Sequence, residues 1–97
     1  MSSTPSNPEV RHNPASGRYE TEVDGHLAVV DYTLEGDRMT LTRTFVPPEL
    51  RGRGVAELLV RAALETARAK GLRIVPQCSY VARFIERNAG YQTLLVG

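Results

Sequence analysis

Alternation of apolar and polar residues predicts three strands in the first half of the chain. Residues 18–23 alternate, with Tyr, Thr and Val side chains on one side and acidic side chains on the other, as in a half-buried strand. The turn Asp24-Gly25 predicts a hairpin to a second strand over 26–34, which is rich in Val, Leu and Tyr. After another turn, a third strand is expected over 39–46. These segments predict an antiparallel meander.

One charged side chain interrupts the apolar pattern of the third strand. Met39, Leu41, Arg43 and Phe45 occupy alternate positions and are therefore expected on one face. Arg43 could bind a ligand from this row, or it could extend its charged head into water from a solvated face of the sheet.

The second half of the chain predicts a helix, a strand and a second helix. Apolar residues recur with a helical period from Ala56 to Ala67, and Lys70-Gly71 is typical of a helix end. A fourth strand is expected over 72–77, where Pro76 limits pairing and indicates an edge or a splay of the sheet.

The remaining segment completes the expected order of elements. Ser79 can cap a second helix over 80–88, and 91–96 is expected to be a last short strand or a tail. The order β-β-β-α-β-α predicts a mixed α+β fold, an antiparallel meander followed by helix, strand and helix.

Length, charge and cysteine content restrict the possible classes of function. The chain has 97 residues, a formal net charge of +1 and one cysteine. We expect a disordered tail at 1–9 and a single domain over 10–97. The near-neutral charge gives no reason to expect nucleic-acid or membrane partners, and the lone cysteine fits a reducing cytoplasm.

The connection between the third strand and the first helix is the most informative stretch about function. It consists of a basic, glycine-rich turn and the first residues of the helix, Arg51-Gly52-Arg53-Gly54-Val55-Ala56. The start of a helix leaves N–H groups without partners and carries partial positive charge, so it binds phosphates. Glycines let a phosphate approach the backbone, and the arginines add two full charges.

Other phosphate-binding loops fit this sequence less well. The Gly-x-x-x-x-Gly-Lys-Ser/Thr pattern of P-loops is absent, and a dinucleotide fingerprint requires a third glycine where Glu57 stands. A plain connection with exposed arginines remains an alternative. A nucleic-acid module that uses the loop arginines together with Arg61 and Arg68 is disfavoured by acidic residues interleaved along the helix.

The same six residues resemble the Arg/Gln-x-x-Gly-x-Gly/Ala signature of the GNAT superfamily of acyl-CoA-dependent N-acyltransferases. The chain is more closely similar to a small single-domain branch of that superfamily, the YjdJ-type or NATD-like proteins. This resemblance runs from His12 through Val46-Pro47-Pro48 to the Cys78-Ser79-Tyr80-Val81 segment, and on to the end of the chain.

The resemblance implies how coenzyme A (CoA) is bound. It implies a mixed sheet that splays after the third strand, with CoA in the gap. The main chain of Val46 would pair with the pantetheine arm. The diphosphate would be held by the backbone N–H groups of Arg53, Gly54, Val55 and Ala56.

Cys78 and Tyr80 are the catalytic candidates. Cys78 directly precedes the second helix, where the helix dipole favours a thiolate. Three roles for Cys78 remain open. It could be a nucleophile that forms an acetyl-thioester, it could line the cofactor site while the amine attacks acetyl-CoA directly, or it could be part of the core. Tyr80 either protonates the departing CoA thiolate or packs against the sheet.

The resemblance is weakest at the general base. Relatives carry a histidine where this chain has Arg43, and a guanidinium cannot accept a proton. Arg43 could instead bind a substrate carboxylate or a CoA phosphate. Asp31 is a candidate base if it faces the gap, and no spacing of His, Cys, Asp or Glu predicts a metal site.

The sequence therefore predicts an acetyl-CoA-dependent N-acetyltransferase that acts on a primary amine of a small molecule or a protein, as a monomer or a homodimer. The alternative is a CoA- or acyl-CoA-binding protein with little turnover, which the missing histidine and the small size favour. The expected cofactor-binding residues are Val46, Arg51, Gly52, Arg53, Gly54, Val55 and Ala56, and Arg43 is the candidate for substrate binding.

Overall fold

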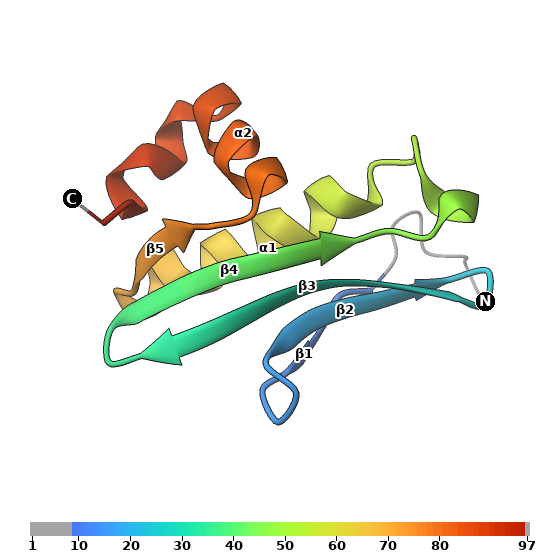
Figure 1. The fold of residues 1–97 in the computed structure, drawn as a ribbon, viewed down its shortest axis with the longest axis horizontal. Helices are drawn as coiled ribbons and strands as arrows, with labels where there is room; N and C mark the ends of the chain where they lie inside the picture. The colour runs from blue at the N-terminus through green and yellow to red at the C-terminus, as the bar shows by residue number, and fades with distance from the viewer. Residues whose placement is uncertain (1–8, 97) are drawn as a thin grey trace, which may run out of the picture.

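A computed structural model describes residues 9–96 and shows one five-stranded mixed sheet (Figure 1). The strands lie in chain order, and each pair is antiparallel except the last, which is parallel. The three-stranded meander predicted from the alternation is therefore confirmed, while the short first strand was not predicted. The strands are β1 (Arg11–Asn13), β2 (Arg18–Val23), β3 (His26–Glu35), β4 (Arg38–Phe45) and β5 (Arg73–Pro76).

The long helix α1 (Val55–Lys70) packs across one face of the sheet (Figure 1). Its apolar stripe includes Leu59, Val60 and Leu64, which are fully buried against the sheet. Burying each of these side chains contributes about 1.5–3 kcal/mol, so the helix is held mainly by packing. Gly71 ends α1 in the left-handed conformation, as the sequence predicted.

The sheet splays between β4 and β5. These strands pair only over Arg38–Leu41 and Arg73–Pro76, and the Cys78 N–H then donates to the Leu41 carbonyl at 2.9 Å. Beyond this point β4 continues to Phe45 paired with β3 alone. The next regular donor, the Gln77 N–H, bonds back to the Val75 carbonyl at 3.0 Å instead of to β4, so the regular pairing ends here, at the place where the sequence predicted an edge or a splay.

Thr42 forms a bulge in β4 that the sequence did not reveal. Asp31 of β3 pairs with Arg43, but the next residue of β3, Tyr32, pairs with Leu41, so Thr42 is one extra residue. Met39 and Leu41 therefore face the core, whereas Arg43 and Phe45 are exposed on the other face. The expectation that these four residues share one face is wrong, because the alternation reverses at Thr42.

The segment after β5 differs from its predicted form in two details. The second helix, α2 (Ser79–Arg87), begins one residue early, so Cys78 and not Ser79 is its N-cap, and no side chain caps it. The C-terminal segment folds into a 3-10 helix, η2 (Ala89–Leu94), where a strand or tail was expected. A single parallel bridge between Ile74 and Leu95 is its only sheet-like pairing among the described residues.

At the N-terminus, residues 1–8 of the expected tail lie outside the described part of the chain. Glu9, the last residue of the expected tail, is described, and its carbonyl accepts a hydrogen bond from the Thr21 hydroxyl at 2.7 Å. No helix within 9–96 combines the length and the apolar character needed to cross a membrane.

Candidate functional site

The loop between β4 and α1 has the open backbone geometry expected of an anion site. A short 3-10 turn, η1 (Pro48–Leu50), buries Leu50 and anchors the loop to the core. Gly52 and Gly54 then adopt φ values of +80° and +76°, which glycine alone adopts without strain. A Cβ added at either position would meet nothing within 4 Å among the described residues, so the space above both is open.

The first turn of α1 presents its N–H groups to this space. Leu58 donates the first backbone hydrogen bond of the helix, to the Gly54 carbonyl at 3.1 Å. The N–H groups of Val55, Ala56 and Glu57 come before that bond, so the helix supplies no acceptors for them. The helix dipole places partial positive charge at the same end.

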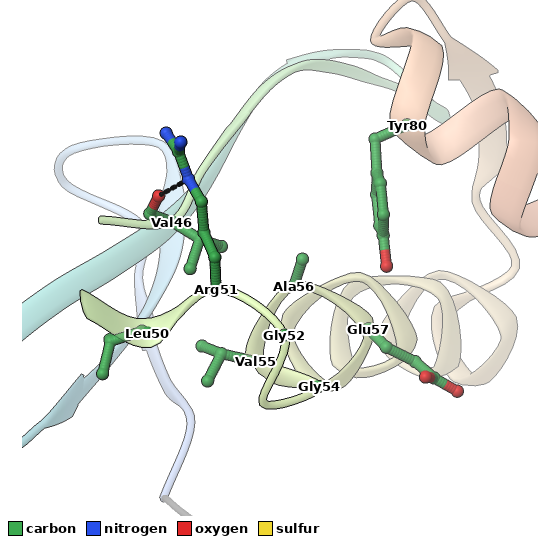
Figure 2. Close-up of a pocket in the computed structure, with 9 residues that line it drawn as sticks. All are labelled: Val46, Leu50, Arg51, Gly52, Gly54, Val55, Ala56, Glu57 and Tyr80. Carbon is green, nitrogen blue, oxygen red and sulfur yellow. Dashed lines mark hydrogen bonds between the residues drawn. The ribbon is translucent and has the colours of Figure 1, made fainter. Parts of the chain in front are cut away.

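A hollow of about 250 Å³ lies over this helix start, between it and the end of β4 (Figure 2). It brings together six of the seven residues expected to bind the cofactor, together with Tyr80. Its lining residues are Val46, Leu50, Arg51, Gly52, Gly54, Val55, Ala56, Glu57 and Tyr80. An adjoining hollow shares Val46, Arg51, Ala56 and Tyr80 and adds Thr44 and Phe45.

The two arginines of the loop make different contacts. Arg51 lines both hollows, and its Nε donates to the Val46 carbonyl at 3.1 Å (Figure 2). Arg53 does not line either hollow, because its guanidinium forms an ion pair with Asp24 at 3.2 Å in the turn between β2 and β3. Only the backbone of Arg53 therefore remains close to the helix start.

Cys78 lies at the inner end of the splay, half-buried, with its Sγ 3.5 Å from the Thr44 hydroxyl. Burial raises the pKa of Cys78, but the hydrogen bonds from Thr44 and from the N–H groups of Val81 and Tyr80 outweigh it. The net effect lowers the pKa below its ordinary value. Cys78 lines neither hollow, but Thr44, which it contacts, lines the adjoining one.

Tyr80 extends from the first turn of α2 toward α1 and reaches the hollow (Figure 2). Burial raises the pKa of its phenol, and the negative charge of Glu57 raises it further, while Arg87 lowers it. The phenol therefore keeps its proton at neutral pH and can act as a donor. The side chain is 38% exposed, so it does not serve only to fill the core.

Arg43 is not part of the hollows. Its Nε donates to Asp31 at 3.1 Å, and the second oxygen of Asp31 accepts from Arg18, also at 3.1 Å. All three lie on the sheet face opposite α1, because Asp31 points away from its buried neighbours Val30 and Tyr32. Arg43 thus lies on the face away from α1, and Asp31 does not face the gap.

Some residues of the site were missed in the sequence. Thr44 and Phe45 escaped notice because the bulge at Thr42 hides which face each occupies. Leu50 was missed because its apolar side chain gives no indication of a binding role. Glu57, an acidic residue in the first turn of a predicted helix, could have been found from its position. Within residues 9–96, no group of three or more His, Cys, Asp or Glu side chains could hold a metal ion.

Comparison with known proteins places the chain among acyltransferase-like domains. The profile of the GCN5-related N-acetyl-transferase family matches residues 18–94. Protein NATD1 of Bos taurus is 33% identical over 82 residues, covering 81% of this chain and 73% of the relative. Protein NATD1 of Homo sapiens is 30% identical over 82 residues, with coverage of 81% and 73%.

A solved structure shows the same arrangement of elements. A GCN5-like protein of Staphylococcus aureus, determined by NMR, superposes with a TM-score of 0.74 and 28% sequence identity. The match covers 95% of this chain and 91% of the other. The similarity therefore extends over the splay and the loop as well as the sheet.

Proposed function

Because this chain belongs to the family of GCN5-related N-acetyltransferases, we propose that it transfers an acetyl group from acetyl-CoA to a primary amine. The observation that carries this proposal is the helix start of α1. It faces an open hollow at the end of β4, where β5 no longer pairs with that strand, and it has two glycines at positive φ and an arginine beside them.

The residues of the loop fit the diphosphate of CoA. The N–H groups of Arg53, Gly54, Val55 and Ala56 would donate to its oxygens, and Arg51 would add a full positive charge. The main chain of Val46, which lines the hollow at the open end of β4, would pair with the amides of the pantetheine arm. Acetyl-CoA supplies the activated thioester that an amine can attack.

Cys78, Thr44 and Tyr80 are the groups placed to assist the transfer. In one route the Cys78 thiolate attacks the acetyl carbon, the bond from that carbon to the CoA sulfur breaks, and Tyr80 gives its proton to the departing sulfur. An amine then attacks the acetyl-thioester, the bond from the acetyl carbon to the Cys78 sulfur breaks and restores the thiolate, and the proton that the amine loses returns to Tyr80. In the other route the amine attacks the thioester directly, and Cys78 lines the site. A lowered thiol pKa supports the first route.

A mass measurement distinguishes the two routes. After mixing with acetyl-CoA and quenching with acid, the covalent route leaves the chain heavier by one acetyl group. The same treatment of Cys78→Ala should leave it unmodified, with transfer to amines lost. An unmodified wild-type chain together with full activity in Cys78→Ala would eliminate the covalent route.

A CoA-binding protein with little turnover is the second candidate function. It is favoured by the placement of Asp31, which is held by two arginines on the face away from the hollow, and by Arg43, which cannot accept a proton. In the direct route a protonated substrate amine must first lose a proton to a base, and neither residue can serve as that base. Release of free CoA in the presence of a panel of amines separates the enzyme from the binder.

The binding site itself is tested by Gly54→Asp. The carboxylate would place negative charge at the helix start, so CoA affinity should be lost while the fold survives. A wild-type chain at CoA concentrations 100 times the dissociation constant should gain about 2.7 kcal/mol, or roughly 10–20 °C in melting temperature. Gly36→Asp is the matched control, because Gly36 also has a positive φ with open space around it, but in the turn between β3 and β4. Equal stabilisation of both variants by CoA would reject the site.

A further inference from the structure

The guanidinium of Arg51 covers the end of β4 on the side of the hollow. Its Nε donates to the Val46 carbonyl at 3.1 Å, as Figure 2 shows. β4 has already separated from β5 after Leu41, so β5 offers nothing to this part of the strand. The Val46 carbonyl is therefore satisfied by a side chain of the loop instead of a neighbouring strand.

Arg51 also differs from other arginines near the loop in its charge balance. Arg53 is paired with Asp24, and Arg61 is paired with Glu57 at 2.9 Å. Within the described residues, no carboxylate lies within 4.0 Å of the Arg51 guanidinium. Its charge stays uncompensated beside the free N–H groups of the helix start.

Arg51 therefore has one neutral acceptor, the Val46 carbonyl, and lies beside a helix start where an anion would be a second acceptor. We propose that Arg51 is a specificity residue that makes binding of the pantetheine arm conditional on the diphosphate. The inference deepens the proposed CoA site and rests on it. A diphosphate at the helix start offers the guanidinium charge-assisted hydrogen bonds that are stronger than its bond to a neutral carbonyl. Once Arg51 turns to the phosphates, the Val46 carbonyl is free to accept from an amide of the pantetheine arm.

A thioester without a diphosphate has no such effect. It must displace Arg51 from Val46 and offers the guanidinium no acceptor in return, so the lost hydrogen bond opposes its binding. Arg51 therefore selects CoA thioesters against short thioesters that share the same acyl group and amides. The selected chemical class is a thioester that carries a diphosphate.

The test compares acetyl-CoA with S-acetylpantetheine, which has the same thioester and amides but no phosphate, by isothermal titration calorimetry. Arg51→Met keeps the apolar stem and removes both the charge and the donor. We expect it to bind acetyl-CoA about tenfold more weakly, and S-acetylpantetheine about fivefold more tightly, than the wild-type chain. Arg38→Met is the matched control and should leave the affinity for S-acetylpantetheine unchanged, because Arg38 is an exposed arginine at the other end of β4 from Val46.

The role of Arg51 is identified by the two affinity changes having opposite signs, a weaker binding of acetyl-CoA and a tighter binding of S-acetylpantetheine. If S-acetylpantetheine binds Arg51→Met no better than it binds the wild-type chain, or binds neither, the proposal is overturned while the CoA site stands. If the wild-type chain fails to bind acetyl-CoA, the proposed function is rejected as well. Thermal melting verifies that Arg51→Met is folded, and Arg51→Ala provides a second variant with the same expected signs.

Discussion

Thr44 and Cys78 meet across the splay although 34 positions separate them in the chain. The bulge at Thr42 turns Thr44 to the face shared with Val30, and the start of α2 brings Cys78 against it. The sequence identified Cys78 from its place before a helix, but it gave no sign of Thr44. A bulge is set by pairing between strands, so a single strand's alternation does not reveal it.

This contact predicts that Thr44→Val raises the pKa of Cys78. The hydrogen bond from Thr44 lowers the pKa, so its loss should raise the pKa and reduce the fraction of thiolate at neutral pH. No neighbouring charge compensates for the lost hydrogen bond at Cys78. Arg43 points to the other face of the sheet, and the negative charge of Glu57 raises the pKa of Tyr80 instead. The measurement is the pH midpoint of thiolate absorbance near 240 nm.

The controls for this prediction use two further hydroxyl positions. Thr44→Ser retains the hydroxyl and should restore most of the wild-type midpoint. Thr40→Val removes a threonine from the paired part of β4, away from Cys78, and should leave the midpoint unchanged. An identical midpoint in Thr44→Val and the wild-type chain would show that Thr44 does not act on the thiol.

At the scale of elements, the local sequence pattern was sufficient to predict a helix or a strand wherever one face of that element packs against the core. The meander and α1 follow from the alternation and from the helical stripe, because each buries a regular row of residues. β1 was not predicted, since its three residues are too few to show a pattern and it is held by pairing with β2. The 3-10 helix η2 was missed because tertiary contacts of Tyr91 with Glu65 and Arg61 hold it against α1.

The end of α1 offers a direct test of an element boundary. Gly71 adopts φ +70°, and its N–H donates to the carbonyls of Ala67 and Arg68. Gly71→Ala forces a Cβ into this left-handed conformation and should cost about 1 kcal/mol, lowering the melting temperature by roughly 4–8 °C. Gly90→Ala is the control, because Gly90 does not adopt a positive φ and a Cβ added there would meet nothing within 4 Å among the described residues. Equal melting temperatures for the two variants would contradict the role of Gly71.

At the scale of the whole molecule, the outermost strand is tied to the centre of the sheet by an aromatic cluster. His12 of β1 stacks on Tyr19 of β2 with ring centroids 4.3 Å apart, and its Nε2 and the Tyr32 hydroxyl of β3 share a hydrogen bond. Burial lowers the pKa of His12, and the positive charge of Lys70 at the end of α1 lowers it further. The neutral imidazole is thus part of the folded state. This cluster could not be predicted from the sequence, since the neighbours of His12 come from three other elements.

This linkage predicts how the stability of the folded chain depends on pH. A lowered pKa in the folded state means that the unfolded chain takes up a proton more readily as the pH falls below about 6.5. The contribution of His12 is therefore fully present above that pH, and it is lost as the pH falls through the lower pKa of the folded state. Thermal unfolding between pH 7.5 and pH 5 should show a steeper loss of melting temperature for the wild-type chain than for His12→Gln, which cannot titrate. Parallel curves for the two would mean that His12 has the same proton affinity in both states, and that the cluster does not couple protonation to the integrity of the sheet.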